Sequence, residues 1–173
     1  MNNNRWAVVL GNGYNSTNQK PVLLVQYLDG AKELKRIPVS NDAPGVGHAV
    51  DNGLAAPRLV DLNGDGMPDV AYAGDNRGNM WKFNLTSHDA TNWGVAFGGT
   101  PLFTARGPAS LGSATRGQNQ PITAAPIVAA NDRVKTVGTG PTATTVAVGG
   151  MMVAFGTGRH VDKYDASNRD VQS

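Results

Sequence analysis

The stretch "LVDLNGDGMPDVAYAG", residues 59–74, places three aspartates and one asparagine within nine positions, between two apolar runs. An ordinary hairpin turn needs only an Asn-Gly or Asp-Gly pair, so the extra negative charge requires another explanation. Counted from Asp61, the pattern is D-x-N-x-D-G-x-x-D, with Asn63 at position 3, Asp65 at position 5 and Asp69 at position 9. Three carboxylates this close together repel one another unless a cation neutralises them.

The pattern suits calcium, which takes about six to eight oxygen ligands. Side chains at alternate positions of a tight loop can converge on one point, and the main-chain carbonyl at position 7 can add a further oxygen. Gly66 permits the sharp reversal that wraps such a loop around an ion. The sequence therefore predicts a calcium loop over residues 61–69, with ligands Asp61, Asn63, Asp65, Met67 and Asp69.

Other cations and other kinds of loop fit this pattern less well than calcium does. Magnesium prefers stricter octahedral geometry and retained water, and zinc prefers His and Cys ligands. The loop is not an EF-hand, because position 12, where that loop closes with Glu, is Tyr72. The plain alternative is a solvated turn, in which Asp and Asn are common, although such a turn does not require carboxylates at positions 1, 5 and 9.

Composition favours an all-β chain. Of the 173 residues, 40% are hydrophobic and only 16% are charged, and there are 22 Gly and 10 Pro. Many turn-forming residues with few charges fit β structure better than a helical bundle. The net charge of +2 comes from scattered basic residues without interleaved aromatics, so we expect no nucleic-acid partner. Cysteine is absent, which excludes disulfides and thiolate chemistry, and the first residues show no signal peptide or membrane span.

Apolar runs separated by turn residues predict the strands. Asp29-Gly30-Ala31 lies between two such runs and predicts a hairpin. Residues 79–85, "NMWKFNL", alternate so that Trp81, Phe83 and Leu85 share one apolar face, which we interpret as core rather than a ligand platform. Residues 131–145 are expected to form a turn and an excursion. The predicted strands are residues 5–10, 21–28, 32–39, 57–62, 69–74, 79–85, 121–130 and 146–158, with a weaker one at 101–105.

Two fragments recur: "AAPRLV" at 55–60 resembles "AAPIVA", which begins 69 positions later. Each precedes an apolar strand that ends in a glycine turn. Repeated strand-and-turn units of this kind predict β-propeller blades, here of four antiparallel strands with long loops and a calcium-binding hairpin. We therefore expect residues 1–173 to form about three blades, a partial propeller that is a fragment of a larger domain.

Other candidate sites are weak. The three histidines, His48, His88 and His160, lack metal-ligand spacing and are interpreted as surface or satisfied residues. The "GNG" at 11–13 and "GTG" at 156–158 lack the context of a phosphate loop and read as turns. No nucleophile elbow or paired acid–base carboxylates occur outside the acidic loop, so we predict no catalytic residues and no small-molecule substrate.

Several longer segments resemble a known family. "RWAVVLGNGYNS" (5–16), "NGLAAPRLVDLNGDGMPDVAYAGDNRGNMWKFNL" (52–85), "QPITAAPIVA" (120–129) and "VAFGTGRHV" (153–161) together resemble the C-terminal region of the PilC/PilY proteins, which are type IV pilus biogenesis factors and tip adhesins. The loop, with its closure at position 9 and its β flanks, also resembles the calcium loops of integrin-type propeller blades.

The PilC/PilY resemblance implies a non-enzymatic, modified β-propeller that is exported and displayed at the periplasm, outer membrane, cell surface or pilus tip. It implies that calcium in the loop 61–69 tunes pilus extension against retraction, and with it adhesion or twitching motility. The implied partners are type IV pilus components, the minor pilins, and the host-cell surface. The adhesive N-terminal region of the family is absent from this sequence.

Two other functions are left open by the residues. "GDNRGNMWKFNL" also resembles a blade repeat of quinoprotein dehydrogenases, although such an enzyme holds its calcium beside a cofactor on the propeller axis rather than in one local hairpin. The second of these other functions is that of a carbohydrate-binding propeller.

Overall fold

The computed structural model describes residues 1–14, 16, 20–39, 52–107 and 119–158. Within these ranges the chain is all-β, with three short 3₁₀ turns and no α-helix, as predicted. No helix there is long and apolar enough to cross a membrane. The strands are β1 (Ala7–Gly11), β2 (Val22–Tyr27), β3 (Leu34–Pro38), β4 (Arg58–Val60), β5 (Val70–Gly74), β6 (Asn79–Asn84), β7 (Gly94–Val95), β8 (Phe103–Thr104), β9 (Ile127–Ala130), β10 (Val134–Val137), β11 (Thr144–Ala147) and β12 (Met151–Ala154); the 3₁₀ turns are η1 (Ala90–Asn92), η2 (Phe97–Gly99) and η3 (Gly140–Thr142).

The first sheet contains β1, β2 and β3 in sequence order, all antiparallel. Alternate residues of β2 are buried, which follows from the two-residue period of a strand. The predicted hairpin is confirmed: β2 and β3 lie inside the predicted ranges, and Lys32 N–H donates to Asp29 O (3.0 Å) in the turn. Arg5 lies beside this turn and pairs with the carboxylates of Asp29 and Glu33.

The second sheet is four strands wide. β4, β5 and β6 are neighbours, and both β7 and β8 pair with β6. β7 pairs near Phe83 and β8 pairs near Met80, so these two short strands form one outer strand that is interrupted at residues 96–102. The predicted four-stranded blade is therefore present here, with its outermost strand broken in two.

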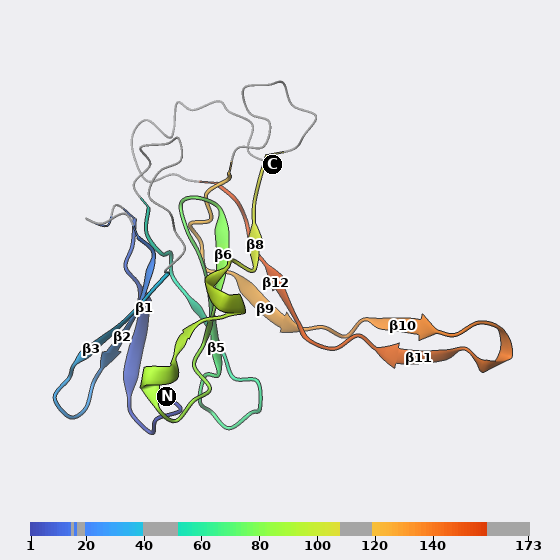
Figure 1. Cartoon of the computed structure of the whole chain (residues 1–173), viewed down its shortest axis with the longest axis horizontal. Coiled ribbons are helices and arrows are strands. Elements are labelled where there is room, and N and C mark those ends of the chain that lie inside the picture. The colour runs from blue at the N-terminus through green and yellow to red at the C-terminus, as the bar shows by residue number, and fades with distance from the viewer. Residues whose placement is uncertain (15, 17–19, 40–51, 108–118, 159–173) are drawn as a thin grey trace.

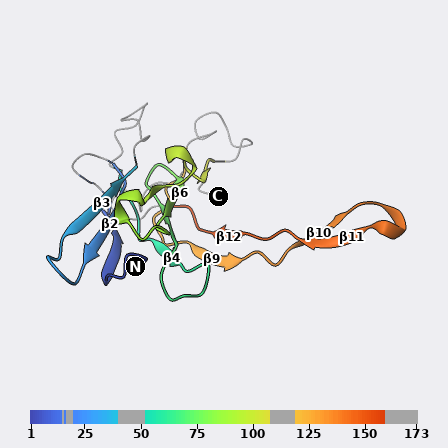
Figure 2. The ribbon, with the colours of Figure 1, turned by 60° about the horizontal axis from the view of Figure 1, so that its bottom comes forward.

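The third sheet is the antiparallel pair of β9 and β12, and it continues into a projecting hairpin of β10 and β11 (Figures 1 and 2). Residues 131–145, predicted to form a turn and an excursion, do project from the sheets (Figure 1), but they also contain β10 and the start of β11, which were not predicted. The single strand predicted over 146–158 was wrong, because it is divided. The division falls at Gly149 and Gly150, whose positive φ angles of 69° and 82° interrupt the extended chain.

Two hydrophobic clusters lie on opposite faces of the second sheet. One joins Leu23 and Val25 of the first sheet to Trp81 and Phe83 of β6. The other joins Tyr72 and Met80 to Ile122, with partly buried side chains from β9 and β12 packed against it. The three sheets are thus packed face to face, and the apolar stripe of Trp81, Phe83 and Leu85 is core, as predicted. Over the described ranges the sheets do not close on themselves, which is the arrangement of a partial propeller.

Candidate metal centre

The acidic loop connects β4 to β5, two strands of the central sheet. These strands pair from Arg58 opposite Tyr72 to Val60 opposite Val70, and Asp69 N–H donates to Val60 O (2.9 Å) at the base of the loop. Residues 61–66 are exposed. The β flanks inferred from the sequence are therefore correct, and they fix the two ends of the loop in the sheet.

Asp61 lies at the centre of the loop's hydrogen bonds. Its Oδ1 accepts the N–H groups of Asn63 (3.2 Å) and Gly64 (2.7 Å), and its Oδ2 accepts the N–H of Gly66 (2.7 Å). Gly66 has φ of +84°, a conformation that glycine adopts without strain. These N–H donors, that of Gly66 foremost, hold the pKa of Asp61 below its ordinary value, because they favour its charged carboxylate form.

Asn63 and Asp65 form further hydrogen bonds within the loop. Asn63 Oδ1 accepts the N–H of Asp65 (2.9 Å), and Asn63 Nδ2 donates to Asp65 Oδ2 (3.0 Å). Asp65 Oδ1 in turn accepts the N–H of Met67 (2.8 Å). Side chains two residues apart therefore fold back onto the loop, which is the local geometry that Asp and Asn adopt in turns.

Asp69 is placed differently from the other predicted ligands. Its side chain is buried, its Oδ2 accepts the N–H of Leu62 (2.8 Å), and its Oδ1 lies 3.5 Å from Asn2 Nδ2. Asn2 Nδ2 also donates to Pro68 O (2.9 Å) and Leu85 O (3.1 Å). The N-terminal segment thus holds the end of the loop, an interaction that the sequence analysis missed because nothing in "MNNNR" signals it.

The structure links Asp61, Asn63 and Asp65 directly, whereas Asp69 contacts the loop only at the N–H of Leu62. Within the described ranges, no group of three or more Asp, Glu, His or Cys side chains is gathered as a metal cluster. The donors that are present are all oxygen, the kind that calcium prefers. Each oxygen of Asp65 and the side-chain oxygen of Asn63 accepts one of these hydrogen bonds and keeps a second lone pair. The residues therefore fit calcium by donor chemistry.

Asp75 is a second notable carboxylate, which the sequence analysis did not single out. It is fully buried at the turn between β5 and β6. Its Oδ1 accepts the N–H groups of Arg77 and Asn79 (2.9 Å each), and its Oδ2 accepts Asn79 Nδ2 (3.0 Å) and Trp81 Nε1 (2.9 Å). The role of this aspartate is to organise the turn, which gives the motif "GDNRGNMW" a structural explanation.

The histidines do not form a site in the described part of the chain. His88 Nδ1 lies 2.5 Å from Asn2 O, so its ring is satisfied by the main chain, in agreement with the sequence interpretation. His48 and His160 lie outside the described residues.

The fold and the loop together define a class: a β-propeller portion whose stacked antiparallel sheets carry an acidic loop on the central sheet. Residues 1–173 match the family model described as the PilY1 beta-propeller domain, and the chain belongs to this family.

Named relatives agree with this assignment. The chain is 34% identical to the type IV pilus biogenesis factor PilY1 homolog of Xylella fastidiosa (strain Temecula1), with 100% of the chain and 11% of that protein covered. It is 35% identical to the type IV pilus biogenesis factor PilY1 of Pseudomonas aeruginosa PAO1, with 96% and 13% covered. The crystal structure of the P. aeruginosa PilY1 C-terminal domain is similar at a TM-score of 0.71 and 36% identity, with 96% of this chain and 32% of that chain covered.

Proposed function

We propose that this chain is a non-enzymatic, calcium-binding propeller module of a type IV pilus biogenesis factor. Its membership of the PilY1 beta-propeller domain family supports the pilus role, as do the names of the relatives that cover it. The chain spans about a tenth of the length of those relatives. In this proposal, the occupancy of the loop by calcium shifts the balance between pilus extension and retraction, and thereby adhesion or twitching motility.

The observation that carries the calcium proposal is the linked series of oxygen donors in the loop. Asp61, Asn63 and Asp65 are hydrogen-bonded within one exposed turn, and two of the three are carboxylates. A calcium ion held there would supply the positive charge that this turn lacks. The proposed ligands are Asp61, Asn63 and Asp65, with the carbonyl of Met67 and the carboxylate of Asp69.

Asp69 connects the loop to the rest of the fold through hydrogen bonds. Its main-chain carbonyl accepts the N–H of Leu85 (2.8 Å) at the end of β6, and its carboxylate holds the loop at Leu62. Asn2 bridges the same region by donating to Pro68 O. A change in the orientation of Asp69 would therefore act on the N-terminal segment and on the central sheet together.

The direct test is a calcium titration of the chain by isothermal calorimetry. Asp65→Ala should abolish binding while circular dichroism retains the β signal, because Asp65 is exposed and contributes nothing to the core. Asp132→Ala is the matched control, since it removes another exposed carboxylate outside the loop. Unchanged affinity in Asp65→Ala would refute the assignment of this ligand.

The regulatory part of the proposal is tested in cells. Asp65→Lys places an ammonium group in the loop, where it can substitute for the charge of the ion. A strain carrying this change in the parent protein should extend pili without calcium, and a strain carrying Asp65→Ala should not. Equal piliation of the two strains at every calcium concentration would show that the loop does not regulate extension.

The remaining parts of the proposal concern partners and place. We assign the module to exported proteins of the periplasm, outer membrane, cell surface or pilus tip, with minor pilins and the host-cell surface as its partners.

The absence of enzymatic activity is checked by adding a quinone cofactor, an alcohol and a dye acceptor. Turnover that depends on the chain would favour the quinoprotein alternative.

A further inference from the structure

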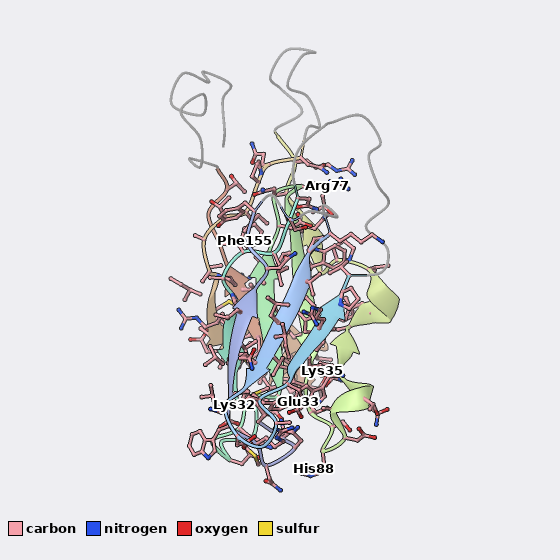
Figure 3. The ribbon with its side chains drawn as sticks, turned by 90° about the vertical axis from the view of Figure 1, so that its left-hand side faces the viewer. Lys32, Glu33, Lys35, Arg77, His88 and Phe155 are labelled. Carbon is pink, nitrogen blue, oxygen red and sulfur yellow. The ribbon has the colours of Figure 1, made fainter. Side chains whose placement is uncertain are left out.

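A groove of about 490 Å³ lies between the first and second sheets. One wall is β3, which contributes Lys35, Arg36 and Ile37, and the other is the segment from Thr91 to Gly99 that contains β7 and η2. Trp93 and Ile37 are buried and supply apolar surface to the lining. Figure 3 shows Lys35 at the side of the first sheet that adjoins the green segment with η1 and η2.

The wall formed by β3 is an open strand edge. Tyr27 N–H donates to Glu33 O (3.2 Å) and Val39 N–H donates to Pro21 O (3.1 Å), so the odd-numbered residues of β3 direct their main-chain groups toward β2. By the alternation of an antiparallel ladder, Leu34, Arg36 and Pro38 direct theirs away from β2. No described residue hydrogen-bonds to these outward main-chain groups. In the described part of the chain this edge is therefore unpaired, and an unpaired edge is a template for another strand.

The first and second sheets differ in the strand that follows their third strand. The second sheet has a fourth position beside β6, filled by β7 and β8. In the described part of the chain the first sheet stops at its third strand, β3, and the groove lies along that strand. The groove therefore adjoins the outer edge of the first sheet.

The charge of the groove selects its occupant. Lys35 and Arg36 lie on opposite faces of β3, because neighbouring residues of a strand alternate, and neither forms an ion pair with a described residue. The lining contains no carboxylate. Outside the lining, Asp89 interacts electrostatically with Lys35, and its Oδ1 also accepts the N–H of Thr91 (2.8 Å).

We propose that the groove binds an extended acidic peptide segment of a partner protein, which adds to β3 as the fourth strand of the first sheet. The main-chain groups of Leu34 and Arg36 pair with the peptide. Its apolar row lies over Ile37 and Trp93, on the face of β3 that carries Lys35, and its row of carboxylates lies on the opposite face, where Arg36 attracts them. Pro38 has no N–H, so pairing is limited to the part of β3 before it. This strand-addition mode uses main-chain bonds for affinity and side chains for selection.

The test measures binding of fluorescent peptides to the 173-residue chain by anisotropy. The probe is a short peptide that alternates valine and glutamate, and the comparison peptide alternates valine and lysine. The acidic peptide should bind, and the basic peptide should bind at least about tenfold more weakly, because opposite charges across an interface select the partner. Equal binding of the two peptides would overturn the proposal.

A pair of matched variants locates the site. The double variant Lys35→Glu/Arg36→Glu should weaken the acidic peptide about tenfold or more. Arg133→Glu/Lys135→Glu reverses the same number of charges on the exposed projecting hairpin and should change the affinity by less than about twofold. A loss in the second variant as large as in the first would mean that binding follows net charge alone, and would contradict the groove.

Hydrogen exchange separates strand addition from a simple electrostatic contact and needs no variant. The acidic peptide should slow exchange at the amides of Leu34 and Arg36, which point into the groove. It should leave the amide of Lys35 unchanged, because that amide already pairs with β2. Uniform or absent protection along β3 would overturn strand pairing. Concentration-dependent dimerisation of the chain by sedimentation, lost on adding the peptide, would instead assign the edge to a second copy.

Discussion

At the scale of single residues, two aspartates show how surroundings decide what a carboxylate does. Asp61 is exposed and is held by amides of its own loop, so it remains charged and accessible. Asp75 is buried and collects donors from the main chain and from Trp81, so its role is to hold a turn. The same side chain is thus exposed in a surface loop in one place and organises a buried turn in the other.

The lowered pKa of Asp61 predicts a pH dependence. Because the folded pKa lies below the unfolded one, the loop's hydrogen bonds contribute stability above the unfolded value and lose it as pH falls through the folded value. The carboxyl carbon of Asp61, followed by NMR in the absence of calcium, should titrate at lower pH in the folded chain than in a peptide of residues 59–74. A midpoint equal to that of the peptide would show that the loop amides do not hold this carboxylate.

Asp75→Ala should destabilise the chain by about 3 kcal/mol, because it leaves the buried Nε1–H of Trp81 and nearby amides without their acceptor. Urea unfolding monitored by tryptophan fluorescence measures this change. Asp132→Ala, at an exposed position, should change stability by less than about 0.5 kcal/mol. Similar values for the two variants would remove the structural role assigned to Asp75.

At the scale of elements, the sequence predicts best where alternation and turn chemistry agree. The hairpin of β2 and β3 follows from Asp29-Gly30 between two apolar runs, and β6 follows from the spacing of its aromatic residues. β7 and β8 have two residues each, too few to produce a pattern. β10 and β11 are exposed along their whole length, so no apolar face marks them.

The turn between β5 and β6 offers a matched test of backbone geometry. Gly78 has φ of +78°, and a Cβ there would lie 2.5 Å from Gln120 O and 2.9 Å from Ala105 O. Gly149 has φ of +69° with nothing within 4 Å of such a Cβ. Gly149→Ala should therefore cost only about 1 kcal/mol of conformational strain. Gly78→Ala should cost more than about 2 kcal/mol beyond that, because main-chain oxygens cannot move aside freely. Equal losses in thermal unfolding would contradict this packing.

The candidate site could be predicted only in part from the sequence, for a physical reason. The spacing of Asp61, Asn63 and Asp65 encodes a local turn, and local hydrogen bonds form it. The contact between Asn2 and Pro68 joins residues 66 positions apart, so only the packed fold brings them together. The burial of Asp69 follows from that same packing.

At the scale of the whole molecule, the acidic loop is attached to the sheet that both hydrophobic clusters share. An interaction that stabilises the loop between β4 and β5 therefore also stabilises the packing on both faces of the second sheet. The chain covers 32% of the solved PilY1 C-terminal domain, and its three packed sheets form a portion of that larger fold.

Calcium should therefore raise the melting temperature by mass action. Free calcium at one hundred times its dissociation constant stabilises the folded state by about 2.7 kcal/mol when it binds the folded state alone. Differential scanning calorimetry measures the shift, and magnesium at equal concentration serves as the control cation. The shift should vanish in Asp65→Ala, and no shift of the unaltered chain at millimolar calcium would contradict a site in the folded state.

The projecting hairpin of β10 and β11 has a practical consequence. Residues 132–150 are exposed and belong to neither hydrophobic cluster, and the hairpin extends away from the three sheets (Figure 1). Its tip is therefore a permissive position for an epitope or a dye, because a label there leaves the acidic loop and the groove beside β3 unchanged.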